Sequence, residues 1–191
     1  MNIICQTNSI TIRKMADSLM DYTLMSTWLT DHAVLKYYEG RDNPYNLEKV
    51  KEKFGPRIRV DNYVIPCIIE YENLPVGYIQ YYRADAENPI MDEPSVRENL
   101  IGEYQNPYAM DLFIGEPDYW NKGIGTAVVR LLVDYLLKND IADIIFIDPQ
   151  TWNKRAIRCY EKCGFKPITV LEKHELHEGE YRDNLIMAIR D

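Results

Sequence analysis

The run Trp120-Asn121-Lys122-Gly123-Ile124-Gly125-Thr126 joins a predicted strand, 108–114, to a predicted amphipathic helix, 123–138. Its two glycines let the backbone come close to a ligand, and the first turn of a helix offers unpaired amide hydrogens and a positive dipole end. Together these features predict a site for a phosphate or pyrophosphate. The spacing excludes the dinucleotide-binding fingerprint, because Val128 stands three positions after Gly125, and no Gly-Lys-Ser/Thr follows to make a P-loop. An ordinary helix start that contains glycine is the alternative.

The elements on both sides of this turn predict an α/β fold with a mixed sheet. Helices are expected at 18–29, in a short piece capped by Asp31, at 47–54 after a cap at Asn46, and at 153–163. Strands are expected at 10–13, 63–71, 76–82, 108–114, 144–147, 165–171 and 185–189. The turn 72–75 suggests a hairpin, 85–105 is a long polar loop, and the charged segment 172–183 is expected to join the last two strands. Strands that alternate with helices in the second half are typical of an α/β fold.

Composition and charge narrow the class of function. The net charge of −8 and the scattered Lys and Arg residues argue against a nucleic-acid partner. No apolar run approaches the ~18 residues that a membrane helix needs, and the first residues show no secretory signal, so we expect a cytoplasmic protein with no membrane partner. The four cysteines and three histidines show no zinc-like spacing, so we expect reduced thiols and no metal. We expect one domain over 1–191, as a monomer or a homodimer.

A second motif lies downstream, in the stretch from Asn153 through Ala156-Ile157 and Tyr160 to Gly164-Phe165. With the Gly-x-Gly turn about one helix length upstream, it resembles the GNAT superfamily of N-acetyltransferases. The resemblance implies a mixed, mostly antiparallel central sheet flanked by helices, with acetyl-CoA bound between splayed central strands.

The roles of single residues follow from the same resemblance. Gly123 and Gly125 would cradle the pyrophosphate, Asn153 would contact the pantetheine region, and Tyr160 would protonate the departing thiolate. Read from the residues alone, Asn153 is equally a helix cap and Tyr160 a core aromatic. Family members usually carry Arg or Gln where this chain has Trp120, which shifts the expected binding toward backbone amides. The full expected set for acetyl-CoA is Phe113, Ile114, Lys122, Gly123, Ile124, Gly125, Thr126, Asn153, Ala156 and Tyr160.

The resemblance extends to the aminoglycoside 6'-N-acetyltransferases through the stretches 28–31, 37–42, 75–80 and 110–120. Within this family, the chain is similar to the acetyltransferase half of the bifunctional acetyltransferase–phosphotransferase. Because the chain stops at Asp191, no phosphotransferase domain is expected. The implied activity is transfer of an acetyl group to the 6'-amine of an aminoglycoside, which confers resistance. Family members often carry Gln after the strand aspartate, whereas Leu112 follows Asp111 here.

The acceptor chemistry gives independent support, because polycationic aminoglycosides need carboxylates, hydroxyls and flat aromatic faces. The nucleophile must be the neutral amine, so some group, or a chain of waters, has to accept its proton. We assign that role to Asp111, with Asp148 as a second ammonium ligand or a partner in the proton transfer; a purely binding role for Asp111 is the alternative. Residues expected on the acceptor side are Tyr37, Tyr38, Glu39, Asp42, Gln80, Glu103, Asp111 and Asp148.

Two rival functions stay open at this point. The acceptor could be a protein N-terminus, a lysine or a polyamine, or the chain could be a non-catalytic coenzyme A sensor. Cys159 and Cys163 are nucleophile candidates only in principle, because no His–Cys motif is visible. We therefore expect direct transfer in a ternary complex, with backbone amides near Phe113 and Ile114 polarising the thioester carbonyl.

Overall fold

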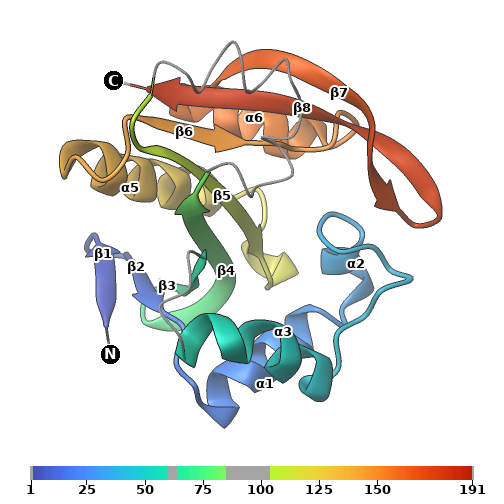
Figure 1. Ribbon diagram of the computed structural model, residues 1–191. Helices are drawn as coiled ribbons and strands as arrows, with labels where there is room; N and C mark the ends of the chain where they lie inside the picture. Colours follow the sequence, from blue (N-terminus) through green and yellow to red (C-terminus); the bar gives the residue numbers. More distant parts are fainter. Residues whose placement is uncertain (1, 60–63, 85–103, 191) are drawn as a thin grey trace.

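The structure is a computed structural model that describes residues 2–59, 64–84 and 104–190. Eight strands of these residues form one sheet in the order β1-β2-β3-β4-β5-β6-β8-β7 (Figure 1). All neighbouring strands are antiparallel except β5 and β6, so the prediction of a mixed, mostly antiparallel sheet is confirmed. The strands are β1 Ile3–Gln6, β2 Ile10–Lys14, β3 Val64–Tyr71, β4 Leu74–Arg83, β5 Pro107–Ile114, β6 Ile144–Ile147, β7 Lys166–His177 and β8 Glu180–Arg190.

The helices begin where side chains satisfy their first backbone amides. Ser18 accepts a hydrogen bond from the Asp21 amide at 3.3 Å, and Asn46 accepts one from the Lys49 amide at 2.9 Å. Asp31 accepts one from the Ala33 amide at 2.7 Å, which confirms the predicted cap. The helices are α1 Leu19–Trp28, α2 His32–Leu35, α3 Leu47–Arg59, α5 Ile124–Lys138 and α6 Lys154–Cys163, with a 3₁₀ turn, η3, at Pro117–Tyr119.

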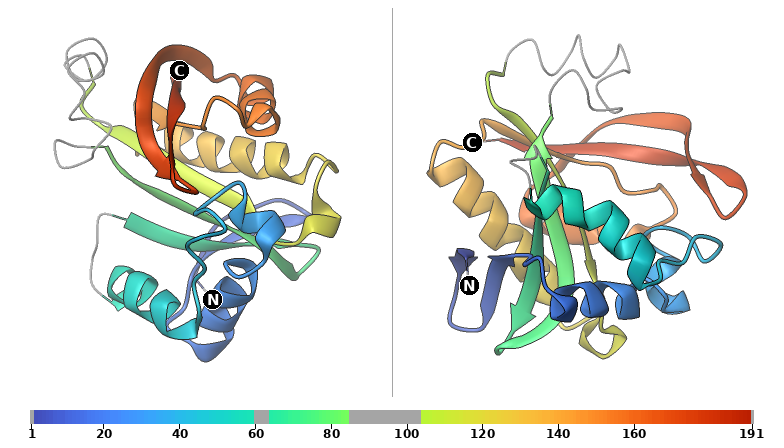
Figure 2. Two further views of the ribbon diagram at one scale, coloured as in Figure 1. Left: turned by 90° about the vertical axis from the view of Figure 1, so that its right-hand side faces the viewer. Right: turned by 60° about the horizontal axis from the view of Figure 1, so that its bottom comes forward.

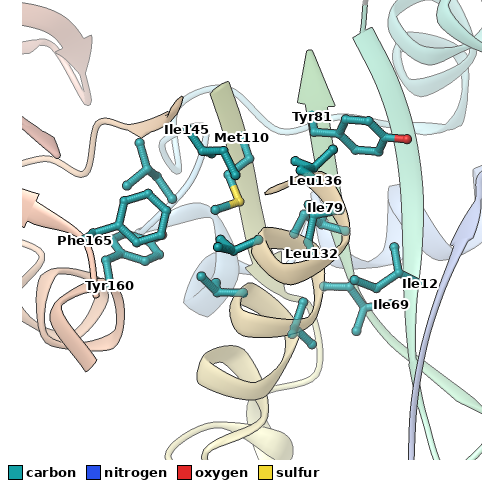
Figure 3. Close-up of a cluster of buried hydrophobic side chains, with 14 of the residues drawn as sticks. Ile12, Ile69, Ile79, Tyr81, Met110, Leu132, Leu136, Ile145, Tyr160 and Phe165 are labelled. Atoms are coloured by element: carbon teal, nitrogen blue, oxygen red, sulfur yellow. The ribbon is translucent and has the colours of Figure 1, made fainter. Parts of the chain in front are cut away.

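Two hydrophobic clusters cover opposite faces of the sheet, because alternate strand residues point to opposite sides. Ile68 and Tyr78 pack with α1 and α3 on one face. Ile69, Ile79 and Met110 pack with α5 on the other (Figures 2 and 3). The sheet is therefore buried on both faces at its centre, which fixes the position of β4 and β5.

The strands β5 and β6 pair only near their starts. Pro107–Ala109 lies in parallel register with Ile144–Phe146. Beyond this point Met110–Ile114 pairs only with β4, while β6 continues beside β8. The two strands therefore part at the middle of the sheet, as the resemblance predicted.

Three sequence expectations are corrected. The helix expected to end at Phe54 runs through Pro56 to Arg59, because Gly55 is buried and Ile58 packs against the same cluster as Phe54. The edge strand β1 was not predicted. The segment 172–183, expected as a connection, is the outer part of the β7–β8 hairpin, with its turn at Glu178-Gly179.

None of the helices in the described ranges is long and apolar enough to cross a membrane. All four cysteines are free thiols.

Candidate active site

A cleft of ≈ 810 Å³ opens where β5 and β6 part. Most of the predicted site residues line it. Lys122 and Asp42 do not; the Lys122 ammonium lies 5.4 Å from the centre of the Tyr119 ring. Glu103 lies outside the described residues. The predicted residues that the cleft brings together are Tyr37, Tyr38, Glu39, Gln80, Asp111, Phe113, Ile114, Gly123, Ile124, Gly125, Thr126, Asp148, Asn153, Ala156 and Tyr160.

The glycine turn forms one end of the cleft. Gly123 precedes α5 in the left-handed region, at φ 80°, which favours glycine. A Cβ at Gly125 would meet only the Cys159 sulfur, at 3.8 Å, so the protein leaves space in front of this backbone. The first turn of α5 faces that space with amides that have no partner within the helix. This open, amide-lined turn fits a diphosphate.

Cations on one face of α6 lie beside this turn. Arg155, Arg158 and Lys162 all line the cleft and follow the i, i+3, i+7 spacing of a single helix face. The Arg155 guanidinium lies 4.1 Å from the centre of the Trp120 ring and 4.4 Å from that of Tyr37. We did not identify these three residues from the sequence, although their helical spacing was visible there.

Trp120 has a structural task in this loop. Its indole nitrogen donates a hydrogen bond to the Ile114 carbonyl at 2.8 Å, which ties the loop to the end of β5. It also carries the Arg155 guanidinium on its ring. Arg155 of α6 thus places a cation beside the position at which the resemblance implied Arg or Gln.

Asn153 and Tyr160 each have a structural role, as a helix cap and a core aromatic, and each also lies at the cleft. The Asn153 side chain caps α6 by accepting a hydrogen bond from the Ala156 amide at 3.2 Å, and it also lines the cleft. Tyr160 is largely buried beside Phe165, yet it reaches the cleft wall. Burial raises the pKa of Tyr160 well above its ordinary value, so its phenol stays protonated and can donate.

The Asp111 carboxyl is held by a chain of polar side chains from β4 and α3. Gln80 donates to its Oδ2 at 2.6 Å. The Gln80 carbonyl oxygen accepts in turn from the Tyr78 hydroxyl at 2.8 Å and from Arg57 at 2.9 Å. Burial raises the pKa of Asp111, while hydrogen bonds from Gln80 and Tyr82 and the charge of Arg57 oppose the rise. Asp111 is therefore an oriented carboxyl on the cleft wall.

Asp148 follows β6 and lies near a second carboxyl. The Asn184 amide donates to Asp148 Oδ2 at 3.3 Å and to Glu175 Oε2 at 3.2 Å. Burial, followed by the negative charges of Asp111 and Glu175, raises the pKa of Asp148 to about 8. Glu175 also lines the cleft, and we did not predict it, because its strand was expected to be a loop.

Another wall of the cleft is formed by residues of the loop after α2. The Tyr38 ring packs on Phe113 with centroids 4.7 Å apart, and Tyr37 stacks on Trp152 at 5.4 Å. Glu39 is already paired with Lys53, and the Tyr45 hydroxyl donates to it at 3.1 Å. Lys53 lines the same region, so this wall carries a neutralised carboxylate and aromatic faces.

One thiol is also exposed to the cleft. Cys159 Sγ lies 3.3 Å from the Thr126 hydroxyl, close to the glycine turn. Hydrogen bonds from Cys163 and Thr126 and the charge of Lys162 lower the pKa of Cys159 to about 7, despite the burial that raises it. In the part of the chain that the structure describes, no group of three or more His, Cys, Asp or Glu side chains could hold a metal ion.

We compared the sequence and the structure with those of known proteins. The model of a family described as an acetyltransferase (GNAT) domain matches residues 17–173. The aminoglycoside N(6')-acetyltransferase type 1 of Klebsiella pneumoniae is 30% identical over 166 residues, which cover 86% of this chain and 78% of that protein.

Solved structures show the same relationship. A crystal structure of the aminoglycoside acetyltransferase AAC(6')-Ib in complex with coenzyme A and kanamycin is 26% identical, with a TM-score of 0.73 over 95% of each chain. A spermidine N-acetyltransferase from Vibrio cholerae has a TM-score of 0.73 over 96% of each chain at 18% identity, a likeness of fold alone.

Proposed function

The chain belongs to the GNAT acetyltransferase family, among the relatives of the aminoglycoside N(6')-acetyltransferases, and we propose on that premise that it transfers the acetyl group of acetyl-CoA to the 6'-amine of aminoglycoside antibiotics. This transfer would confer resistance to them. The enzyme would act in the cytoplasm as a single domain spanning 1–191, either as a monomer or as a homodimer. The relatives' names point to this acceptor, and the site chemistry supports it independently.

One observation carries the proposal: the two ends of the cleft differ in charge. Cations of α6 and the open amides of α5 lie at the glycine turn, where a diphosphate would bind. Three carboxyls, Asp111, Asp148 and Glu175, lie where β5 and β6 part, close enough to raise the pKa of Asp148. On the carboxyl side Lys53 and Arg57 are engaged by Glu39 and Gln80. The cleft can therefore hold a phosphate-bearing ligand at its glycine turn and an acceptor with ammonium groups at its carboxyls. Acetyl-CoA and an aminoglycoside are such a pair.

The mechanism is direct transfer in a ternary complex. Asp111 accepts the proton of the attacking amine, because Gln80 holds its carboxyl in place on β5. Backbone amides near Phe113 and Ile114 polarise the thioester carbonyl. The protonated phenol of Tyr160 donates to the departing thiolate. Cys159 lies at the glycine turn, where its Sγ contacts the Thr126 hydroxyl, and the proposed transfer forms no acyl-enzyme.

Acetyl-CoA would be held mainly by backbone groups. The turn at Gly123 and Gly125, with Ile124 and Thr126, would grip the diphosphate, and Lys122 would act only through bulk charge because it is not in the cleft wall. Asn153 and Ala156 would contact the pantetheine arm. Tyr37, Tyr38, Glu39, Gln80, Glu103 and Asp148 would bind the acceptor together with Asp111.

The decisive experiment compares kanamycin with a derivative that lacks the 6'-amine. Purified protein is mixed with acetyl-CoA and either compound, thioester loss is followed by absorbance, and the product is identified by mass spectrometry. We expect one acetyl group on kanamycin and none on the derivative. Equal acetylation of both compounds would exclude the 6' position. Transfer to peptides or spermidine, with none to kanamycin, would instead identify a different acceptor class. Tight coenzyme A binding without transfer to any amine would identify a sensor.

A further inference from the structure

The tip of the β7–β8 hairpin is tied to the loop that follows α2. Glu178 at the tip accepts three hydrogen bonds from Arg41, from its backbone amide at 3.0 Å, from Nε at 2.5 Å and from a terminal guanidinium nitrogen at 2.6 Å. One residue before, His177 Nε2 lies 3.2 Å from the Lys36 carbonyl oxygen. In Figure 1 the far end of the hairpin extends beyond the sheet toward the part of the chain that contains α2.

Both tied segments carry walls of the cleft. Tyr37, Tyr38 and Glu39 lie between the two contact points in the loop, and Glu175 lies three residues before the hairpin tip. Trp152 lies between the two segments, with its ring 5.4 Å from that of Tyr37 and 5.9 Å from that of His177. A change in the distance between loop and hairpin would therefore change the space between the aromatic wall and Glu175.

Local geometry favours this close approach. Gly40 has φ 91°, a conformation that favours glycine, and a Cβ there would lie 3.5 Å from Glu178 Cγ and 2.7 Å from Asp42 Oδ1. The hydrogen bonds from Arg41 lower the pKa of Glu178 to about 2, so the carboxylate is charged at every pH at which the enzyme is assayed. The ion pair is also partly exposed, 48% for Arg41 and 22% for Glu178, so it is not a core contact.

We propose that Arg41 and Glu178, with His177, form a clasp that positions the loop 37–39 against the hairpin and so sets the acceptor affinity of the cleft. All three clasp residues are positioning residues, because none of them lines the cleft itself. The proposal rests on the proposed function for its acceptor, kanamycin. The glycine turn itself lies outside the clasp, and Arg155 of α6 contacts the clasped loop at the Tyr37 ring. Binding of acetyl-CoA should therefore depend on the clasp less than binding of kanamycin does.

The test uses Arg41→Met, which keeps the side-chain length and removes the charge, and Glu178→Ala. Arg59→Met is the matched control, because Arg59 forms a similarly exposed ion pair with Asp17, away from the cleft. We expect the KM for kanamycin to rise roughly three- to ten-fold in both clasp variants, with kcat near wild type and a clearly smaller rise in the KM for acetyl-CoA. Arg41→Lys should recover part of the affinity. Hydrogen exchange in the segment 36–41 should be faster in Arg41→Met than in wild type or Arg59→Met.

Equal losses toward both substrates would overturn the clasp, since a general loss of structure predicts them. Unchanged KM for kanamycin would overturn it as well. If the wild-type protein acetylates no aminoglycoside, the proposed function fails. The clasp is then tested by the hydrogen-exchange measurement without the kinetics. Faster exchange confined to 36–41 supports the tie between loop and hairpin, and unchanged exchange rejects it.

Discussion

At the scale of single residues, the two aspartates of the cleft differ in the charge that surrounds them. Arg57 and Lys53 oppose the rise in the pKa of Asp111. Asp148 instead faces Asp111 and Glu175, and both raise its pKa further. Asp111 is thus the better candidate for a base that is ionised before the acceptor binds, whereas Asp148 holds its proton until ammonium groups arrive.

Replacement of Asp111 by Asn should lower kcat by roughly 10²–10⁴-fold, because the amide keeps the shape but accepts no proton. Steady-state kinetics with kanamycin would measure the change. The acid limb of the wild-type kcat/KM profile should lie above the pH of an ordinary carboxyl, since burial raises the pKa of Asp111. A variant that alters only the KM would show that Asp111 binds the acceptor and is not the base.

Replacement of Asp148 by Asn should change how stability depends on pH in the absence of ligand. The pKa of this carboxyl is raised to about 8, so its contribution to folding is complete below about pH 4 and is lost as pH rises toward 8. The melting temperature of the variant should therefore fall less than that of the wild type between pH 5 and 8.5. Asp134→Asn, which changes an exposed carboxyl on α5, should follow the wild-type curve. Parallel curves for Asp148→Asn and wild type would refute the assignment.

At the scale of elements, the beginning of α5 is open for a ligand rather than for packing. Gly125→Ala would place a methyl group in ordinary contact with the Cys159 sulfur alone, so the fold should tolerate it. Alanine also suits a helix better than glycine, and thermal stability should stay level or rise slightly. The KM for acetyl-CoA should nevertheless increase by roughly ten-fold or more, because the methyl group would point at the diphosphate.

The KM for kanamycin serves as the internal reference for Gly125→Ala and should not move. If acetyl-CoA binds the variant as well as it binds the wild type, the turn does not grip the diphosphate.

Elements with a buried face could be predicted, and elements without one could not. The helix α5 and the strands β3 to β6 have clear apolar patterns, and their predicted ranges are confirmed within a few residues. The outer part of β7 is mostly charged, and its only buried residue is His177, so its sequence shows no apolar alternation. The short strand β1 lies at a sheet edge with Ile3 exposed. The helix α3 was expected to end at Phe54, but it continues through Pro56 to Arg59, where Ile58 packs against the same cluster as Phe54.

At the scale of the whole molecule, a buried ion network joins the sheet to α1. Arg13 on β2 donates to both Asp21 oxygens, at 2.7 and 2.9 Å, and to Glu70 on β3 at 2.7 Å. Asp21 is fully buried, and its Oδ2 also accepts from the Ala16 amide at 2.7 Å. The network holds α1 against the central strands and is independent of the cleft.

Replacement of Asp21 by Ala should therefore destabilise the protein by roughly 3–5 kcal/mol, because it leaves the Arg13 charge buried with one partner fewer. Urea unfolding would measure this change. Asp134→Ala, which breaks the exposed pair with Lys138, should cost about 0.5 kcal/mol or less. Similar losses in the two variants would mean that the Arg13 network contributes no more than a surface pair.

Only part of the site could be predicted from the sequence, because some of its residues are brought together by strand pairing and not by a local motif. Residues fixed by a motif, such as Gly123, Asn153 and Tyr160, were placed at the cleft by their order along the chain. Glu175 was missed because only the β7–β8 pairing brings it beside Asp148. Arg57 was missed because it lies beyond the predicted end of its helix, although it orients Gln80.

The acidic thiol of Cys159 has a practical consequence for anyone who measures this reaction. Colorimetric disulfide reagents, the usual detectors of liberated coenzyme A, react with thiolates, and the lowered pKa of Cys159 gives it more thiolate near neutral pH than an ordinary cysteine has. The reagent would therefore form a mixed disulfide with Cys159 in the wall of the cleft beside Gly125. The enzyme would lose activity during the assay that measures it. Progress curves recorded in this way should bend over time, whereas a Cys159→Ser protein should give straight ones.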